Sequence, residues 1–180
     1  HLDGLSTIVL MLCKSCSFKT DRLIVREWRT LSDLDIPQAL VSILTPRVTQ
    51  SLPDGWQGEY DIDRATMWIA ERDSEGATLL VLDGASRAPI GLMILFESEE
   101  EGGGQCVRIG YMLAEAAWGR GYGSELLQGF VDWCRTTDIA SIIGGVAREN
   151  RASQRVLEKN GFSVKSSTLN QQELIYELRL

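Results

Sequence analysis

The sequence predicts one α/β domain of the α+β kind, in which a mixed, mostly antiparallel sheet of six to seven strands is flanked by about four helices. The first observation is length, because 180 residues can bury one sizeable core but would divide poorly into two domains. The second is the order of strand and helix patterns along the chain, β-α-α-β-β-β-α-β-α-β-β. The third is a run of three consecutive strands in the middle, where hairpin-like turns favour antiparallel pairing.

The first half of the chain predicts one strand and two helices. Residues 22–28 predict the strand, and residues 31–44 predict the first helix. Prolines and glycines over 45–60 indicate a loop. An apolar face with the 3.6-residue period predicts the second helix over 61–73.

The second half adds six strands and two helices. The strands are expected over 78–82, 89–96, 106–113, 141–146, 162–166 and 174–180. The acidic, glycine-rich residues 97–104 predict an exposed loop. Apolar residues at i, i+1, i+4, i+5 and i+8 from Leu126 predict one helix. Residues 150–160 predict the other helix, which Gly161 ends as a left-handed cap.

Composition narrows the classes of function. Hydrophobic residues make up 44% of the chain and charged residues 24%, as in ordinary soluble proteins. The net charge of −7 argues against nonspecific binding to nucleic acid or anionic lipid. The chain has no apolar run of about 18 residues, so we expect no membrane span. With four cysteines and one histidine, we expect no metal centre and a reducing, cytoplasmic setting.

Residues 1–17 are expected to be an N-terminal extension or a cloning remnant, flexible or loosely packed, ahead of a folded domain over 18–180. They contain the pattern C-K-S-C, formed by Cys13 and Cys16. A zinc site would need a second pair of ligands, and a redox motif would need a strand–helix context. The sequence assigns these two cysteines no role.

The stretch WGRGYGS, from Trp118 to Ser124, places three glycines at alternate positions before a helix pattern. A helix N-terminus leaves N–H groups unpaired and carries a partial positive charge, and glycines let the backbone approach a ligand closely. Arg120 adds a cation and Ser124 adds a hydroxyl. These features predict a cradle for an anion such as a pyrophosphate. A tight turn that needs glycine only for its geometry is the alternative.

Two known nucleotide-binding motifs fit this stretch less well. A P-loop needs four residues between its glycines and then Gly-Lys-Ser/Thr, which the stretch does not have. A dinucleotide fingerprint needs a third glycine where Ser124 stands, and it normally follows the first strand of a parallel sheet. A nucleotide-binding module is therefore kept as a lesser hypothesis.

Four stretches together resemble the GNAT superfamily of N-acetyltransferases, and within it the ribosomal-protein N-terminal acetyltransferases. The family's acetyl-CoA motif, Q/R-x-x-G-x-G/A, aligns on residues 118–123. Trp118 replaces Gln or Arg there, and the resulting Trp-Gly pair is similar to the ribosomal-protein branch. The other stretches are 20–28, 109–113, and the pattern N-x-x-S at 150–153 with 156–162. The likeness covers about residues 18–180 and implies the single-domain GNAT fold.

The resemblance implies that acetyl-CoA lies in a V-shaped gap between two parted central strands. Its pantetheine arm would pair with the backbone edge at Met112 and Leu113, and its pyrophosphate would lie on the glycine turn. Asn150 would contact the arm besides capping its helix, and Lys159 belongs to a basic stripe that suits a polyanionic cofactor or is simply solvated. The residues expected at the cofactor are Met112, Leu113, Trp118, Gly119, Arg120, Gly121, Tyr122, Gly123, Ser124, Asn150, Ser153 and Lys159.

The implied chemistry is direct attack of a neutral amine on a thioester in a ternary complex. A base must deprotonate the ammonium, a donor must stabilise charge on the acetyl oxygen, and an acid must protonate the leaving thiolate. Ser153 matches the position of the acid, although a serine on an amphipathic helix is more often inert. Glu97 and Glu27, each at a strand end, are candidates for the base, because Arg108 stands where relatives often carry a glutamate. Water is the other option.

The leading hypothesis is therefore an acetyl-CoA-dependent N-acetyltransferase that acts on a protein N-terminus or a small amine. The alternative is a CoA-binding sensor or structural protein without turnover, which Arg108 keeps open. We expect no metal, nucleic acid or membrane partner, and a homodimer is left open. The sequence does not identify the acceptor amine.

Overall fold

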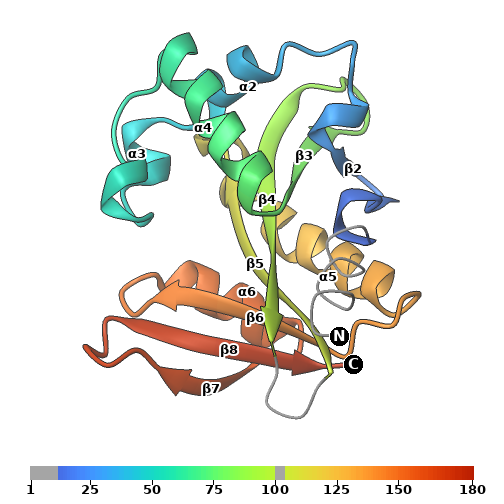
Figure 1. Cartoon of the computed structure of the whole chain (residues 1–180), viewed down its shortest axis with the longest axis vertical. Coiled ribbons are helices and arrows are strands. Elements are labelled where there is room, and N and C mark those ends of the chain that lie inside the picture. The colour runs from blue at the N-terminus through green and yellow to red at the C-terminus, as the bar shows by residue number, and fades with distance from the viewer. Residues whose placement is uncertain (1–11, 100–103) are drawn as a thin grey trace.

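One eight-stranded sheet runs through the whole domain (Figure 1). The structure is a computed structural model that describes residues 12–99 and 104–180. The strands follow the order β1-β2-β3-β4-β5-β6-β8-β7, and all neighbours are antiparallel except β5 and β6, which are parallel. The predicted mixed, mostly antiparallel sheet is confirmed, with one strand more than the six to seven expected.

The predicted strands are all present, and β1 is the addition. They are β1 (Ser17–Lys19), β2 (Leu23–Glu27), β3 (Ala77–Asp83), β4 (Pro89–Glu99), β5 (Gln105–Leu113), β6 (Ser141–Ala147), β7 (Ser163–Ser167) and β8 (Glu173–Arg179). The first and last residues of these strands differ from the predicted ones by no more than one position, with one exception. The exception is β4, which continues to Glu99, into the stretch predicted as a loop.

The helices are α2 (Ile36–Ile43), α3 (Pro46–Thr49), α4 (Ile62–Glu75), α5 (Tyr122–Cys134) and α6 (Arg151–Lys159), with the 3₁₀ turns η1 (Trp28–Thr30), η2 (Asp54–Trp56) and η3 (Glu115–Ala117). The helix predicted over 31–44 begins only at Ile36, because Asp35 caps it and Pro37 lies in its first turn. The loop predicted over 45–60 was wrong in part, since it contains α3 and η2. None of the described helices has the length and apolarity to cross a membrane.

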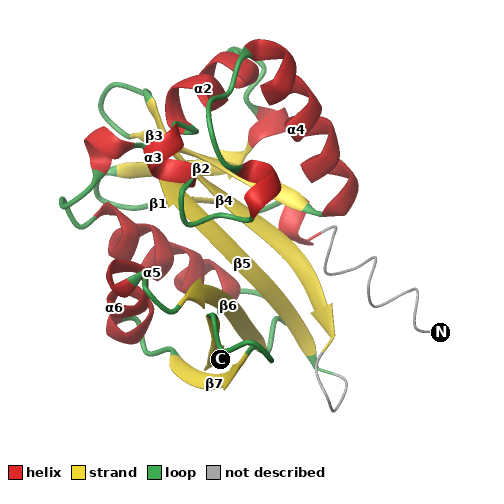
Figure 2. Ribbon diagram, turned by 90° about the vertical axis from the view of Figure 1, so that its left-hand side faces the viewer, coloured by secondary structure: helices red, strands yellow, loops and turns green. Residues whose placement is uncertain are grey.

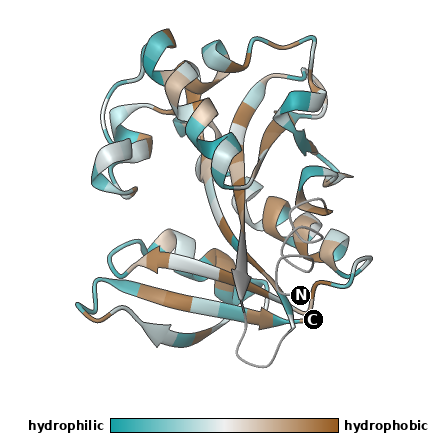
Figure 3. Cartoon of the chain, in the orientation of Figure 1, coloured by the Kyte–Doolittle hydropathy of each residue, from teal (hydrophilic) through white to brown (hydrophobic). Residues whose placement is uncertain are grey.

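Helices cover both faces of the sheet (Figure 2). The face under α5 and α6 packs one core cluster, which includes Val107 and Ile109, whereas the face under α2 and α4 packs a second, which includes Leu80 and Met112. Successive strand residues point to opposite faces, so β5 supplies both clusters. The apolar face predicted for α5 is confirmed, and hydrophobic residues gather on α5 and the central strands (Figure 3).

The described part of the N-terminal segment is packed into the domain. Cys13 and Cys16 are each 1% exposed in the cluster under α5, and β1 pairs with β2. The expected flexible or loosely packed extension is therefore wrong for residues 12–17, while residues 1–11 lie outside the described part. Burial raises the pKa of the Cys16 thiol, so it stays protonated. Within the described ranges, no group of three or more His, Cys, Asp or Glu side chains is arranged to hold a metal.

The two central strands β5 and β6 pair over only the first part of their length. Their parallel register joins Cys106–Ile109 to Ser141–Gly144 and then stops. Beyond it, β5 continues to Leu113 beside β4, whereas β6 continues to Ala147 beside β8. Each strand therefore keeps one partner and loses the other, and the sheet divides here into two halves. We call the place where β5 and β6 diverge, beyond Ile109 and Gly144, the parting.

We predict that Gly129→Val lowers the free energy of unfolding by about 1–3 kcal/mol, the usual cost of overpacking. A Cβ at Gly129 of α5 would lie 2.7 Å from side-chain atoms of Phe18 and Thr20, which come from β1 and the turn after it. Denaturant-induced unfolding measures the change. Gln128→Val, at an exposed position on the same helix, is the control, and equal midpoints for the two variants would mean that β1 does not pack on α5.

Candidate active site

The open edge of β5 is formed by the backbone of Tyr111 and Leu113. The N–H of Ala114 donates to the carbonyl of Ile90 in β4 at 2.8 Å, and residues of an antiparallel strand alternate in the direction of their backbone groups. Met112 therefore also faces β4, while Tyr111 and Leu113 face the side that β6 has left. Leu113 lies as predicted. Met112 does not present its backbone to this edge, and its buried side chain belongs to the core.

Trp118 covers one group of this edge. Its indole Nε1 donates to the carbonyl of Leu113 at 2.9 Å, and the ring is 39% exposed. The guanidinium of Arg47 in α3 lies 5.5 Å from the ring centroid and pairs with Glu115 at 2.6 Å. Trp118 thus joins the outer end of β5 to α3.

The glycine turn has the backbone geometry that only glycine adopts readily. Gly119 has φ +70° and Gly121 has φ +79°, and Gly121 is the N-cap of α5 with no side-chain cap. Gly123 differs, because it lies in the first turn of the helix and a Cβ there would make only ordinary contacts, 3.7 Å from Tyr111. Two of the three glycines are therefore required by the conformation of the turn.

The amides of the turn are available to a ligand. The N–H groups of residues 119–124 donate to no acceptor within the part of the chain that the structure describes. The helical ladder begins at Glu125, whose N–H donates to the carbonyl of Gly121 at 3.1 Å. The hydroxyl of Ser124 accepts from Nδ2 of Asn160 at 3.1 Å, which fixes the start of α5 against the end of α6. Unpaired N–H groups at a helix N-terminus form an anion site.

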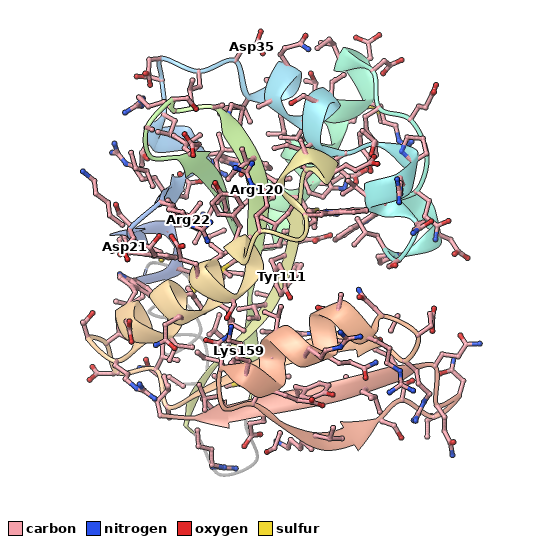
Figure 4. All side chains as sticks on the ribbon, turned by 180° about the vertical axis from the view of Figure 1, so that it is seen from behind. Asp21, Arg22, Asp35, Tyr111, Arg120 and Lys159 are labelled. Atoms are coloured by element: carbon pink, nitrogen blue, oxygen red, sulfur yellow. The ribbon has the colours of Figure 1, made fainter. Side chains whose placement is uncertain are left out.

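Two arginines flank the turn, and the sequence analysis identified only one of them. Arg120 and Arg22 lie over the ring of Tyr122, at 5.3 and 4.1 Å from its centroid (Figure 4). Arg22 pairs with Glu125, whose pKa burial alone would raise, but hydrogen bonds from Thr20 and Arg22 outweigh burial and lower it. Glu125 is thus ionised and engaged away from the turn. Arg22 belongs to the stretch 20–28 that resembled the family, but only its strand pattern had been used.

Ser153 lies across the parting from β5. Asn150 caps α6 through a bond from the N–H of Ser153 to its Oδ1, at 3.2 Å, as predicted for a cap. The hydroxyls of Ser153 and Tyr111 are 3.0 Å apart, so they connect α6 with the open edge of β5. Burial raises the pKa of Tyr111 more than the hydrogen bond with Ser153 lowers it. Tyr111 therefore remains protonated, and the sequence analysis had treated it only as part of a strand.

Lys159 ends α6 and is exposed (Figure 4). The next residue, Asn160, bonds to Ser124, so Lys159 belongs to the end of the helix that meets the glycine turn. Arg151 and Arg155 are also exposed, on earlier turns of the same helix. The basic stripe thus runs along α6 toward the turn.

The two glutamates proposed as the base from sequence lie on strand segments away from the open edge of β5. Glu97 pairs with Val107, at the end where β5 and β6 are still joined, and its side chain lies outside the described residues. Glu27 ends β2, which is separated from β5 by two strands, and its carboxylate accepts from the N–H of Arg29. Glu27 therefore caps η1, and Glu97 remains a prediction that the strand register does not favour.

A different carboxylate lies where the strands part. Glu173 begins β8 opposite Ala147, and its Oε1 occupies the space over Gly145, where a Cβ would be only 1.9 Å away. Gly145 is the first residue of β6 beyond its pairing with β5. Nη2 of Arg108 holds the same oxygen at 3.4 Å. Arg108, which stands where relatives often carry a glutamate, thus holds a glutamate from another strand, a contact that no local pattern reveals.

Two grooves lined by polar residues lie beside the start of α6. One, of about 510 Å³, lies between the end of α3 and the start of α6 and is lined by Gln50, Ser51, Glu149, Asn150, Arg151 and Ala152. A second, of about 560 Å³, is lined by Arg148, Glu149, Arg151, Gln171 and Gln172. The aromatic residues of the 45–60 region behave differently, because Trp56 and Tyr60 pack edge-on against the buried Trp68. These aromatics form core rather than groove lining.

An open strand edge, a turn beside it whose N–H groups have no acceptor among the described residues, and hydroxyls across the parting form an arrangement that suits an extended, diphosphate-bearing ligand. Residues 22–163 match the family model for the acetyltransferase (GNAT) domain. The chain therefore belongs to the GNAT family of acetyltransferases, as its resemblance indicated, and the predicted enzyme class is confirmed. Members of this family generally use acetyl-CoA.

Solved structures share the fold. An acetyltransferase from Bacillus anthracis is 18% identical with a TM-score of 0.73, over 91% of this chain and 98% of that one. An acetyltransferase from Agrobacterium tumefaciens is 22% identical with a TM-score of 0.67, over 92% and 95%. The ribosomal-protein-S5-alanine acetyltransferase from Vibrio fischeri is 14% identical with a TM-score of 0.59, over 91% and 96%. No curated protein matches the chain significantly.

We predict that Gly121→Val weakens CoA binding at least tenfold. A residue with a Cβ pays about 1–2 kcal/mol to keep a positive φ, so the turn relaxes and its amides turn away from the ligand. Isothermal titration with CoA measures the change. Gly55→Val is the matched control, because Gly55 has no positive φ and no atom within 4 Å of an added Cβ. Unchanged affinity in Gly121→Val would show that the turn does not hold the cofactor.

Proposed function

We propose that the protein is an acetyl-CoA-dependent N-acetyltransferase that moves an acetyl group to the primary amine of a protein N-terminus or a small molecule. The observation that carries this proposal is the row of unpaired N–H groups at residues 119–124, placed at the start of α5 beside the open edge of β5. The donor set fits the cofactor, since peptide amides suit a diphosphate and a free strand edge suits an amide-containing arm.

The proposed cofactor residues contribute backbone hydrogen bonds at some positions and charged or aromatic side chains at others. The amides of residues 119–124 hold the diphosphate, while Arg120 and Lys159 add positive charge. Trp118 limits the open edge by engaging the Leu113 carbonyl. The Leu113 N–H and the Tyr111 carbonyl are left for the pantetheine arm, and the Tyr111 N–H is left for the acetyl group. The acetyl thioester is then delivered to the parting, where the hydroxyls of Ser153 and Tyr111 meet.

Glu173 is the carboxylate best placed to act as the base. It lies at the parting on the face opposite α5 and α6, next in sequence to Gln172, which lines one groove, and we place the acceptor amine on this face. Arg108 fixes its position. Glu173, directly or through a water molecule, takes a proton from the acceptor ammonium, and the freed nitrogen forms a bond to the acetyl carbon as the carbon–sulfur bond breaks.

Ser153 supplies the proton that the departing thiolate needs. Its hydroxyl is hydrogen-bonded to Tyr111, whose raised pKa keeps the pair protonated at neutral pH. Tyr111 then reprotonates Ser153 and regains its own proton from solvent. The nitrogen loses its second proton to solvent as the amide forms, and Glu173 releases the first, so the site returns to its starting state. The backbone N–H of Tyr111 donates to the acetyl oxygen as charge develops there.

The similarity to a ribosomal-protein-S5-alanine acetyltransferase supports a protein N-terminus as acceptor. The polar grooves beside Arg151 are open and lined by side chains of both charges, which suits a peptide. An α-amino group has a pKa of about 7.7–8.0, so it needs only a weak base such as a carboxylate.

Thiol release from acetyl-CoA in the presence of peptides, polyamines and aminoglycosides tests the proposal. Release that depends on one class of amine supports it and names the acceptor. Tight CoA binding with no release from any amine would favour a sensor or structural role instead. Titration with ATP and NAD addresses the nucleotide-binding hypothesis, and tight binding of either without CoA binding would overturn the proposal.

We predict that Ser153→Ala and Glu173→Gln each lower kcat by about ten- to a thousandfold, in the range of general acid–base contributions. The CoA dissociation constant should change less than threefold in Glu173→Gln, because Glu173 lies on the acceptor side. Steady-state kinetics and titration give both quantities. Ser166→Ala, in the exposed strand β7, is the control, and full activity in Glu173→Gln would remove this residue from the mechanism.

We also predict a pH dependence that identifies the acceptor amine. For a peptide α-amine, kcat/KM should rise about tenfold per pH unit below about 7.7 and level off above about 8, because the neutral amine is the nucleophile. For a lysine side chain the rise should continue toward about pH 10. Profiles with a free and an N-terminally blocked lysine peptide separate the two cases. A flat profile with both would exclude amine ionisation as a control of the rate.

A further inference from the structure

Arg22 reaches the glycine turn from the other end of the sequence. Its Nη1 donates to the carbonyl of Arg120 at 3.0 Å, and its Nε and backbone N–H donate to the two carboxylate oxygens of Glu125 at 2.7 and 2.9 Å. Its guanidinium lies over the ring of Tyr122, and its Nη2 is 3.5 Å from the position of a Cβ on Gly121. One side chain thus contacts Arg120 in the turn and both Tyr122 and Glu125 in the first turn of α5.

The contact with the Arg120 carbonyl sets the direction of a neighbouring N–H. That carbonyl and the N–H of Gly121 belong to one peptide group, which is planar and trans, so they point in opposite directions. Arg22 holds the carbonyl on its own side of the turn. The N–H of Gly121 is therefore directed to the opposite side, away from Arg22.

Without the contact from Arg22, the direction of the Gly121 N–H would be weakly determined, because glycine tolerates both orientations of the peptide group that precedes it. In the alternative orientation the carbonyl of Arg120, and not the N–H of Gly121, would face a bound anion and repel it. The glycine that opens the turn to a ligand therefore needs a separate contact to fix the peptide, and Arg22 makes that contact.

Arg22 also removes a competing negative charge. Glu125 lies in the first turn of α5, where a carboxylate can occupy the same positive field as a ligand anion. Thr20 and Arg22 engage both of its oxygens on the side of β2. The residue that orients the peptide thus also keeps the acidic side chain away from the anion site.

We propose that Arg22 is the positioning residue of the diphosphate site, which it organises by fixing the Arg120–Gly121 peptide group and by holding Glu125 aside. This inference rests on the proposed function, since it assigns Arg22 a role in binding the diphosphate of CoA. It predicts a selective defect, in which ligands with a diphosphate lose affinity and ligands without one do not.

The test compares Arg22→Met and Arg22→Lys with Arg26→Met in the full chain. Arg26 lies in β2, the strand that follows Arg22, is exposed and has no described contact with the turn, so its loss changes net charge equally. Titration should show CoA affinity about ten- to a hundredfold weaker in both Arg22 variants, the effect of one charge-assisted hydrogen bond, and within about threefold of wild type in Arg26→Met. Lysine keeps the charge but not the forked geometry that reaches Glu125 and Arg120 together.

A truncated donor separates positioning from a general structural role. With S-acetyl-pantetheine, which has no diphosphate, kcat/KM of Arg22→Met should stay within about threefold of wild type, while KM for acetyl-CoA rises. In wild type the Gly121 amide proton resonance should shift when CoA is added, and in Arg22→Met this shift should be lost.

Equal losses with both donors, or full CoA affinity in Arg22→Lys, would overturn the inference. Wild-type protein that binds no CoA would instead overturn the proposed function. Wild-type binding together with unchanged CoA affinity in Arg22→Met would overturn the role of Arg22 alone, so the two failures are distinguishable.

Discussion

The parting of β5 and β6 is the constraint on which the rest of the site depends. Main-chain groups at a strand edge require partners, and here the pairing stops at Ile109 and Gly144 although both strands continue. The chain satisfies one of these groups itself, through Trp118, and leaves the neighbouring ones available. The glycine turn follows the end of β5 and α6 follows the end of β6, so both functional segments are placed by the same break in the sheet.

Two arginine–glutamate ion pairs position negative charge in this acidic chain, one at the glycine turn and one at the parting. At the turn, Arg22 engages Glu125 and so holds that carboxylate away from the proposed diphosphate site. At the parting, Arg108 holds Glu173 over Gly145 and so brings a carboxylate to the acceptor side. The same type of ion pair therefore holds the Glu125 carboxylate away from the glycine turn and holds the Glu173 carboxylate at the parting.

Local sequence pattern was sufficient to predict most helices and strands and the glycine turn, because helix periodicity and the placement of glycines depend on residues that are close in sequence. It identified α5 and the positive-φ glycines, but not β1, whose three residues are too few to show a pattern. The favoured backbone edge was misplaced at Met112 because the direction of each amide depends on the register with β4. Arg22 and Glu173 were missed because their partners lie 103 and 65 residues away.

The proposed cofactor site draws on residues from Arg22 to Asn160, and so on most of the length of the chain. A ligand that binds only the native state adds RT ln(1 + [L]/Kd) to its stability. A ligand bound at the turn would therefore stabilise the segment before β2, helix α5 and helix α6 together. The supply of acyl donor in the cell would then govern the lifetime of the enzyme against proteolysis as well as its rate, and molecules deprived of that donor would be degraded first.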